Sequence, residues 1–219
     1  MLTKEQILEN KNRAINLIRS ISIEGVDNGP LLDLLEKGGY FTAPASTQYF
    51  GSYEGGLCEH SLKVYDILTE LASTYARIPL GDSTTPTYAN DSLILVALLH
   101  DLFKMDYYEI YIKNEKVYSP SGKKVDEIGK FDWVSSKCYK VKDSRYRLTM
   151  GDNQVNTLML INSAFPYLTQ EETCAILNSD GGLSNGYANK DLSAIYSKSP
   201  LATLLHCADM IATYINDEK

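Results

Sequence analysis

The chain has 219 residues, of which 44% are hydrophobic and 22% charged, and its formal net charge is −7. These values are ordinary for one well-buried globular domain, or at most two small ones, and the negative charge argues against a general nucleic-acid coat protein. No apolar run approaches the length of a membrane span, and the first residues lack the pattern of a signal peptide. The four cysteines are scattered and form no C-x-x-C pair, which is typical of reduced thiols, so we expect a cytoplasmic protein.

The first third of the chain predicts three helices and one long loop. An amphipathic helix is expected at 3–22, with a capping box at its start, and a short helix at 31–36. The stretch 40–56 is rich in Gly, Ser, Thr and aromatic residues and is expected to be irregular. Because an ordered loop of this length is often functional, it is a candidate wall of a binding site. A helix is then expected at 57–75.

The middle of the chain begins with a segment that is apolar on every side. Residues 92–99 therefore predict a buried helix, with Asp91 or Ser92 as its N-cap. The sequence that follows is rich in alternating aromatic and β-branched residues, which predicts a small β-hairpin insertion over 107–147. Within this insertion we expect a turn at 114–115.

The charge of the chain is uneven. Residues 104–147 contain 11 Lys and Arg against 7 Asp and Glu, a net charge of +4, which leaves −11 on the rest of a chain whose total is −7. A basic segment on an acidic body suggests a local anionic ligand. A solvated, lysine-rich surface hairpin explains the charge equally well, and both interpretations stay open.

Helices resume in the last third of the sequence. They are expected at 153–165, at 169–177 and at 200–216, the last with Ser199 as its N-cap before a proline. The connection at 178–198 is mostly polar and is expected to lack regular structure. The whole pattern predicts a mainly α protein, a helical bundle with a small β-hairpin insertion.

Metal-capable side chains occur on three of the expected helices. The buried helix ends on His100 and Asp101, and a buried segment should not end on two ionisable groups unless something pairs them. Imidazole and carboxylate are both ligands for divalent cations. His60 lies on the helix at 57–75 and Asp209 on the last helix, so each could join the pair. Taken singly, His60 is equally well explained as a core histidine.

The order and local context of these residues resemble the HD superfamily of metal-dependent phosphohydrolases, whose pattern is H…HD…D. Residues 55–62, GGLCEHSL, resemble the G-G-L-x-x-H-[ST] start of the first ligand helix. Residues 98–104, LLHDLFK, resemble L-x-H-D-x-x-K, and residues 206–209, HCAD, resemble the closing H-x-A-D. The resemblance covers roughly 40–215 and implies one HD-type domain over 1–219.

The resemblance also implies a site and its chemistry. One divalent ion, whether Mn, Fe, Ni, Zn or Mg, would be held by His60, His100, Asp101 and Asp209 and would activate water for attack on a phosphoester. Asp101 would also help to deprotonate the water, and Lys104 would offer a cation to the phosphate. The alternative for Lys104 is a helix C-terminal lysine that interacts with the helix dipole.

Two stretches depart from the pattern of those relatives that bind two metals. Where such relatives carry histidines, this chain has Asp152 in the first stretch and Asp180 in the second. One metal is therefore the expectation, with both aspartates as possible additional ligands and, alternatively, as loop or cap residues. The departures leave open that the site is catalytically weak.

The resemblance implies hydrolysis of a nucleotide or a short nucleotide chain. Aromatic residues before His60 could stack on a base and basic residues of the insertion could meet further phosphates, although core packing and plain surface charge explain them too. The candidate substrate-binding residues are Tyr49, Phe50, Tyr53, Lys137, Arg145 and Arg147. Two alternative functions stay open. One is a 3′→5′ exoribonuclease on short RNA or DNA, and the other is a degenerate HD module that binds a nucleotide or a protein partner without turnover.

Overall fold

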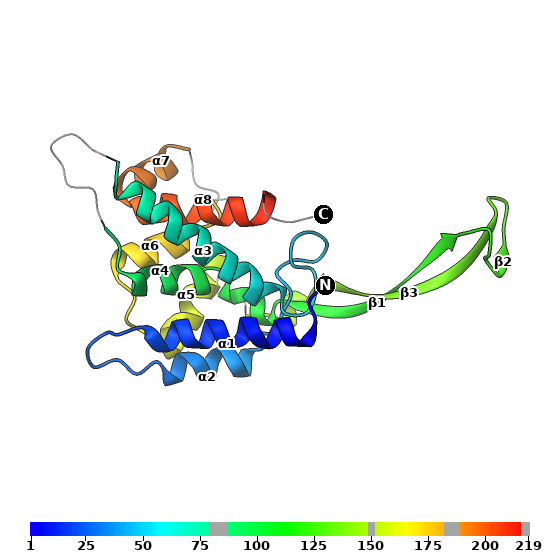
Figure 1. Ribbon diagram of the computed structural model, residues 1–219, viewed down its shortest axis with the longest axis horizontal. Helices are drawn as coiled ribbons and strands as arrows, with labels where there is room; N and C mark the ends of the chain where they lie inside the picture. Colours follow the sequence, from blue (N-terminus) through cyan, green and yellow to red (C-terminus); the bar gives the residue numbers. More distant parts are fainter. Residues whose placement is uncertain (79–86, 149–151, 182–188, 216–219) are drawn as a thin grey trace.

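The computed structural model describes residues 1–78, 87–148, 152–181 and 189–215 (Figure 1). The helices of these residues are α1 (Lys4–Ser20), α2 (Gly29–Gly38), α3 (Gly56–Tyr75), α4 (Asn90–Leu99), α5 (Asn153–Ala164), α6 (Gln170–Leu177), α7 (Asn189–Lys198) and α8 (Pro200–Tyr214). The strands are β1 (Tyr108–Tyr118), β2 (Lys124–Val125) and β3 (Lys130–Val141), and two short 3₁₀ helices are η1 (Leu102–Asp106) and η2 (Ser144–Tyr146). The prediction of a mainly helical protein with a small β insertion is confirmed, whereas a single domain over 1–219 stays a prediction.

Helix α4 lies in the centre of the helical body (Figure 1). All of residues 93–99 are buried, and α4 packs against α1, α3 and α6. A helix that is apolar on every side needs such an enclosure, since any exposed face would place hydrocarbon in water. The predicted buried helix is therefore confirmed.

The predicted N-cap of α4 was wrong. The helix begins at Asn90 after Ala89, and neither Asp91 nor Ser92 caps it. The Asp91 carboxylate instead accepts a hydrogen bond from the backbone N–H of Ser22, at 2.9 Å. Asp91 thus connects the start of α4 to the loop after α1.

Three predicted helix starts are confirmed by their hydrogen bonds. Capping boxes are present at Thr3 with Gln6 and at Thr169 with Glu172, and the Ser199 side chain accepts from the backbone N–H of Ala202. Helix α7, in contrast, was missed, because its sequence is mostly polar. It packs against α8 and places Ile195 and Tyr196 against the core, so tertiary contacts stabilise a segment whose own pattern is weak.

The loop at 40–56 folds back on the start of α3, as its glycines require. Gly55 has a left-handed backbone with φ of 82°, which favours glycine. A Cβ on Gly56 would lie 2.1 Å from the Gly51 carbonyl oxygen, so only glycine allows this close approach of two backbones. The Gly-Gly pair before Leu57 is therefore a structural requirement of the turn that starts α3.

We predict that Gly56→Ala lowers the free energy of unfolding by ~3 kcal/mol, because two backbones must separate to admit the methyl group. Chemical denaturation of both proteins measures the difference. Gly25→Ala is the matched control: Gly25 has a φ of 74° but no atom within 4 Å of the added Cβ. Gly25→Ala should lower the free energy of unfolding by only ~1 kcal/mol, from backbone strain alone. Equal costs for the two variants would contradict the close approach.

Strands β1 and β3 form a long antiparallel hairpin that projects from the helical body (Figure 1). They pair in register from Tyr108 with Val141 to Tyr118 with Phe131. The predicted turn at 114–115 was wrong: both residues continue β1, and Asn114 accepts a hydrogen bond from the Ser135 hydroxyl across the strands. The polar pair Asn-Glu is typical of a turn in sequence, but the same residues are also accommodated in a strand whose two faces are both exposed to solvent. The chain reverses only after β1 ends.

Two further expectations concern the whole chain. Among the residues described, the helices are all too short or too polar to cross a bilayer, in agreement with the lack of a membrane-span pattern. The four cysteines, Cys58, Cys138, Cys174 and Cys207, are unpaired thiols, also as expected.

Candidate metal centre

Two imidazoles from neighbouring helices face each other in the interior. His60 lies on the buried face of α3 and is 4% exposed, and His100 ends α4 and is 1% exposed. Their ring centroids are 5.6 Å apart. The Nδ1 of His100 donates to the backbone carbonyl of Ala97 at 2.9 Å, since a carbonyl can only accept. The Nε2 of His100 is thereby left to face His60.

Two carboxylates complete the group. Asp101 Oδ2 lies 3.5 Å from His100 Nε2 and 3.9 Å from His60 Nε2. Asp209, from α8, places Oδ1 3.0 Å from His60 Nε2 and 3.8 Å from His100 Nε2. The structure therefore brings together all four residues that the sequence predicted as ligands, from three elements far apart in the chain.

The donor atoms fit a metal ion. Neither Nε2 atom makes a hydrogen bond of good geometry among the described residues, although both are fully buried and carboxylate oxygens lie 3.0 and 3.5 Å from them. A buried polar atom without a partner is costly. One donor atom each from His60, His100 and Asp101 lie within 4.8 Å of one another, and imidazole nitrogen with carboxylate oxygen suits a divalent cation. A bound ion would satisfy both nitrogens at once, while the identity of the metal stays a prediction.

Lys104 compensates the charge of this group. Its Nζ lies 2.6 Å from Asp101 Oδ2, and the ammonium stands over the rings of Phe50 and Phe103, at 5.2 and 5.8 Å from their centroids. Burial alone would lower the pKa of Lys104, but the Asp101 carboxylate outweighs burial and raises it. Lys104 therefore stays a cation in a mostly dry environment.

The charged neighbours of Asp101 and His100 also determine the ionisation of these two predicted ligands. Burial would raise the pKa of the Asp101 carboxyl, but Lys104 and the imidazoles outweigh it and hold that pKa far below its usual range. Burial would lower the pKa of His100, but the negative charges of Asp101 first and then of Asp209 outweigh burial and raise it. Asp101 is thus ionised at neutral pH, while His100 holds a proton to higher pH than an ordinary histidine.

A cavity of about 210 Å³ opens beside the four ligands. It is lined by Phe50, Asp101, Phe103, Lys104, Asn153, Gln154, Asp180, His206, Asp209, Met210, Thr213 and Tyr214. Aromatic rings, one ammonium and two of the ligand carboxylates thus line one half-open pocket. The cavity is large enough to bring a small anionic group next to the ligands.

Gln154 supports the site from α5 and was missed in the sequence. It is 2% exposed, and its amide donates to the carbonyls of His100 and Ile176, at 3.0 and 3.3 Å, and accepts from the Ser179 hydroxyl. The Thr157 hydroxyl accepts from the backbone N–H of Phe103 at 3.2 Å. Helix α5 therefore holds the turn after His100 by polar contacts. A glutamine on a helix usually signals a solvated position, so the local pattern could not have identified it.

The two aspartates predicted as additional ligands differ in position. Asp152 caps α5 by accepting from the backbone N–H of Val155 at 2.8 Å, which is the alternative given for it above. Asp180 lines the cavity, together with His206. The Nδ1 of His206 donates to the Ser179 carbonyl at 2.8 Å, and its ring stacks on Tyr196. Of the two aspartates, Asp180 is therefore the one beside the ligands.

The predicted substrate-binding residues lie outside the described cavity lining, apart from Phe50. Tyr49 is 81% exposed, and the Tyr53 hydroxyl donates to Glu59 at 2.5 Å. Lys137 is on β3, Arg145 pairs with Asp143, and Arg147 stacks on Tyr107 with 4.9 Å from its Cζ to the ring centroid. Their roles stay predictions. Phe103, which was not predicted, lines the cavity with Phe50.

No protein-family model, curated protein or solved structure matches this chain. The resemblance to the HD superfamily therefore stays a prediction from three motifs. What the structure adds is independent of any relative: the metal-capable residues of those motifs meet at one buried point.

We predict that metal affinity rises with pH from about 6 to about 8, by up to ~tenfold per unit while one proton is displaced. The raised pKa of His100 means that protons compete for its Nε2 up to a higher pH than for an ordinary histidine, whereas Asp101 is already ionised. Calorimetric titration with Mn²⁺ or Zn²⁺ at several pH values measures this. An affinity independent of pH would show that His100 Nε2 is not a ligand.

We predict that Gln154→Leu lowers the free energy of unfolding by ~2 kcal/mol and weakens metal binding by ~10-fold or more, because the buried His100 carbonyl loses its amide donor and the Ile176 carbonyl loses one of its donors. Gln170→Leu, at the exposed start of α6, is the control and should change neither quantity. Denaturation and metal titration of both variants give the comparison. Unchanged metal binding in Gln154→Leu would mean that α5 does not support the site.

Proposed function

We propose that this protein is a metal-dependent phosphohydrolase that acts on a nucleotide or on a short nucleotide chain. The observation that carries the proposal is the pair of buried imidazole nitrogens without hydrogen-bond partners, which face two carboxylates beside a cavity. Structural histidines are normally satisfied by a protein partner, so the pair favours a metal centre. The three HD-like motifs point to phosphoester chemistry at that centre.

The side chains fit defined roles in this reaction. His60, His100, Asp101 and Asp209 would hold the ion, which when bound supplies a Lewis acid for the phosphoryl group and lowers the pKa of water. Lys104 would neutralise charge that develops on the phosphate, from a buried position where an ion pair is strong. The Asp101 carboxylate, kept ionised by Lys104, would accept a hydrogen bond from the attacking water.

The cavity supports a particular pose of the substrate. Its volume of about 210 Å³ is below the ~300–1,000 Å³ of pockets that enclose a whole drug-sized ligand. The phosphate end would therefore enter the cavity, and the sugar and base would remain at its mouth. Phe50 and Tyr214 line the cavity and offer aromatic surface to them.

A second candidate is a module that binds a nucleotide without turnover. It is favoured by the contact of Lys104 with the very oxygen of Asp101 that faces the imidazoles, and by aspartates where two-metal relatives have histidines. In that case metal and nucleotide would bind but no phosphate would be released. The same assay distinguishes the two functions.

The test is release of phosphate or nucleoside from nucleoside mono- and triphosphates, cyclic dinucleotides and short RNA, with Mn²⁺, Mg²⁺, Ni²⁺ or Co²⁺. We predict about one metal per chain by elemental analysis, from the ligand set of a single ion, and loss of metal and turnover in His100→Ala. Lys104→Met should retain metal but lower kcat by ~10²-fold. Lys11→Met, which removes a distant ion pair with Glu36, is the control.

Three outcomes would contradict the proposed function. Metal and nucleotide binding with no product on any substrate would favour the binding module. Turnover that survives in His100→Ala would place the chemistry elsewhere. Shortening of RNA alone, with no release from mononucleotides, would assign the exoribonuclease instead.

A further inference from the structure

The hairpin of β1 to β3, here called the arm, has two different faces. Residues that pair directly across antiparallel strands point to the same side, so the register defines each face. The first, called the apolar arm face, consists of Tyr108, Ile110, Ile112, Asn114, Lys116 and Tyr118 on β1, with Phe131, Trp133, Ser135, Lys137, Tyr139 and Val141 on β3. The opposite face has the intervening residues. Apolar side chains thus dominate one side of the arm.

Several of these apolar side chains are open to solvent, whereas Phe131 is buried. Ile110 and Ile112 are each 57% exposed, and Trp133 is 50% exposed. An isolated two-stranded hairpin is marginally stable in water, and a contiguous exposed apolar patch usually marks an interaction site. The outer part of the arm projects beyond the helices of its own chain (Figure 1). The occupant of the face therefore has to come from outside the chain.

Charge limits what this occupant can be. By the register of the three strands, the apolar arm face carries Lys116, Lys137 and, opposite Phe131, Lys124 of β2, and no Asp or Glu. The opposite face is balanced, with Glu109, Glu115 and Asp132 against Lys113, Lys130 and Lys140. Two arms packed by their apolar faces would bring only lysines together. An acidic surface with apolar patches is the better complement.

Nucleic acid fits the face less well. Lys116 is already bonded to Asp126 at 2.7 Å and stands over the Phe131 ring. Among the described residues of that face, two lysines have no ion pair, Lys124 and Lys137, and these are too few for a phosphate backbone. The exposed isoleucines are typical of protein contacts, because bases stack on aromatic rings rather than on branched aliphatic chains.

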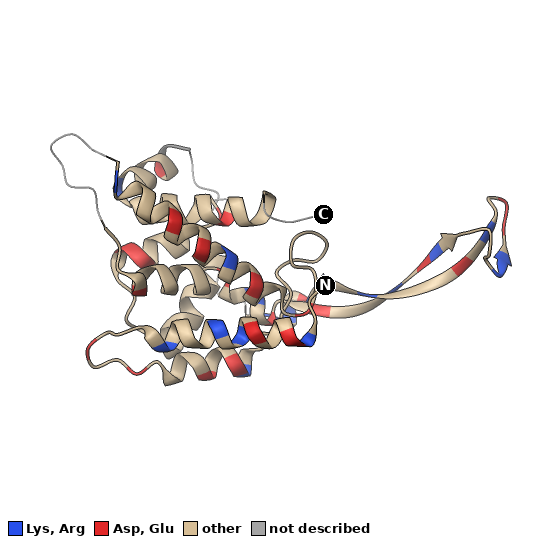
Figure 2. Ribbon diagram, in the orientation of Figure 1, with Lys and Arg blue, Asp and Glu red and all other residues tan. Residues whose placement is uncertain are grey.

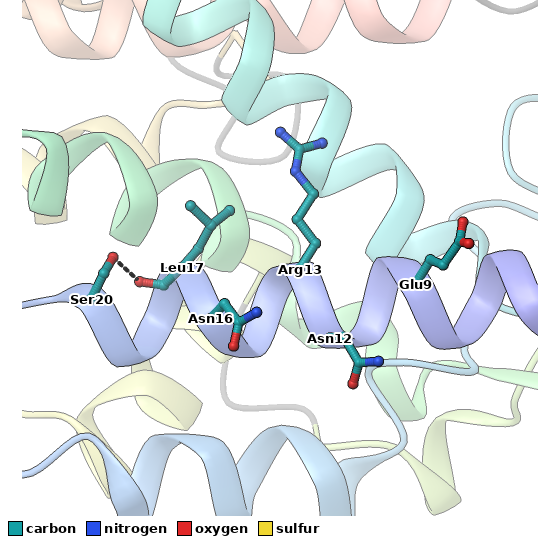
Figure 3. A pocket seen from close by; sticks show the side chains of 6 residues that line it. All are labelled: Glu9, Asn12, Arg13, Asn16, Leu17 and Ser20. Carbon is teal, nitrogen blue, oxygen red and sulfur yellow. Dashed lines mark hydrogen bonds between the residues drawn. The ribbon is translucent and has the colours of Figure 1, made fainter.

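The helical body of the same protein offers the required complement. Outside residues 104–147 the net charge is −11, from a total of −7 and a segment of +4, and acidic residues mark α1, α2 and α3 in Figure 2. A shallow hollow of about 540 Å³ lies along α1, lined by Glu9, Asn12, Arg13, Asn16, Leu17 and Ser20 (Figure 3). A second, of about 300 Å³, lies along α3 and is lined by Asp66, Ile67, Glu70, Leu71 and Thr74.

The two hollows belong to one surface, called the α1–α3 surface. Arg13 points from α1 toward α3 in Figure 3 and forms a bidentate pair with Asp66 of α3. Leu17 and Ile67 supply apolar area, and Glu9 and Glu70 supply charge opposite to that of the arm lysines. The α1–α3 surface thus offers the two properties that a partner of the apolar arm face needs: apolar area and negative charge.

The area is sufficient for a stable dimer if the contact is made twice. An arm of eleven residues is roughly 37 Å long and about 10 Å wide, so one face covers on the order of 400 Å². In a two-fold dimer each chain buries its own arm and the surface under the other arm. This gives ~800 Å² per chain, the usual size of a specific interface.

We propose that two copies of this chain form a two-fold dimer by arm exchange, in which the apolar arm face of each copy lies on the α1–α3 surface of the other. Apolar burial holds the contact, and the basic arm on the acidic body sets its orientation. The dimer is independent of the proposed hydrolase activity, so failure of one leaves the other intact.

The first test is the mass of the full chain by sedimentation equilibrium over a wide range of concentration. The expected result is a monomer–dimer equilibrium. The double variant Ile112→Glu and Trp133→Glu should raise the dissociation constant by ~100-fold or more. The control is Val117→Glu with Val134→Glu on the opposite face, where the side chains are 49% and 47% exposed; it should leave the constant within ~threefold. Circular dichroism and thermal unfolding verify that both variants fold.

The second test locates the receiving surface. Glu9→Lys with Glu70→Lys, on α1 and α3, should weaken the dimer. Glu24→Lys with Asp27→Lys makes the same change of charge in the loop between α1 and α2 and should not weaken it. Carbodiimide coupling of mixed ¹⁴N- and ¹⁵N-labelled chains should join arm lysines to acids of α1 and α3 from different chains.

Four outcomes would overturn the proposal. They are a monomer at every concentration, a dimer that persists in the Ile112→Glu and Trp133→Glu variant, couplings confined to arm with arm, and a dimer unaffected by Glu9→Lys with Glu70→Lys. Binding of a single-stranded oligonucleotide by a monomer, lost in that arm variant, would assign the face to nucleic acid.

Discussion

A buried carboxylate at the end of a wholly apolar helix is the constraint on which the site depends. Asp101 can stay ionised there because Lys104 contacts it directly and because two imidazoles lie within 4 Å of it. The elements around α4 serve this group: α3 brings His60, α8 brings Asp209, and α5 holds the backbone of the turn. A divalent cation would complete the charge balance, since it would provide both imidazole nitrogens with a partner that the described residues do not provide.

Much of this arrangement could be predicted from the sequence, and the reasons are local. Residues 93–99 leave no polar face, so burial of α4 followed directly, and the capping boxes follow from fixed spacings. The missed elements depend on tertiary contacts. Helix α7 needs α8 to cover Ile195, the middle of β1 needs its partner strand at Ser135, and Gln154 matters only because the backbone of His100 lies opposite. Such contacts leave no periodic signal in a single sequence.

The basic insertion shows that the net charge of a segment can suggest a binding role near the site for residues that lie away from it. The excess of lysine and arginine suggested phosphate contacts near the ligands, but Lys137 lies on the arm and Arg145 is paired locally. Lys104 is the one lysine or arginine among the described residues of the cavity lining. The net charge of a segment therefore indicates which ligand it could bind only when the position of each charged side chain in the fold is known.

The root of the arm has a consequence for the ligands. Lys104 belongs to η1, and β1 begins directly after that short helix, while Lys142, just beyond β3, pairs with Asp106 of η1. The residue whose ammonium neutralises Asp101 thus lies only a few residues before the base of the hairpin. Any rotation of the hairpin about its root would displace Lys104. A force applied to the far end of the arm would therefore change the electrostatic potential at the two imidazoles.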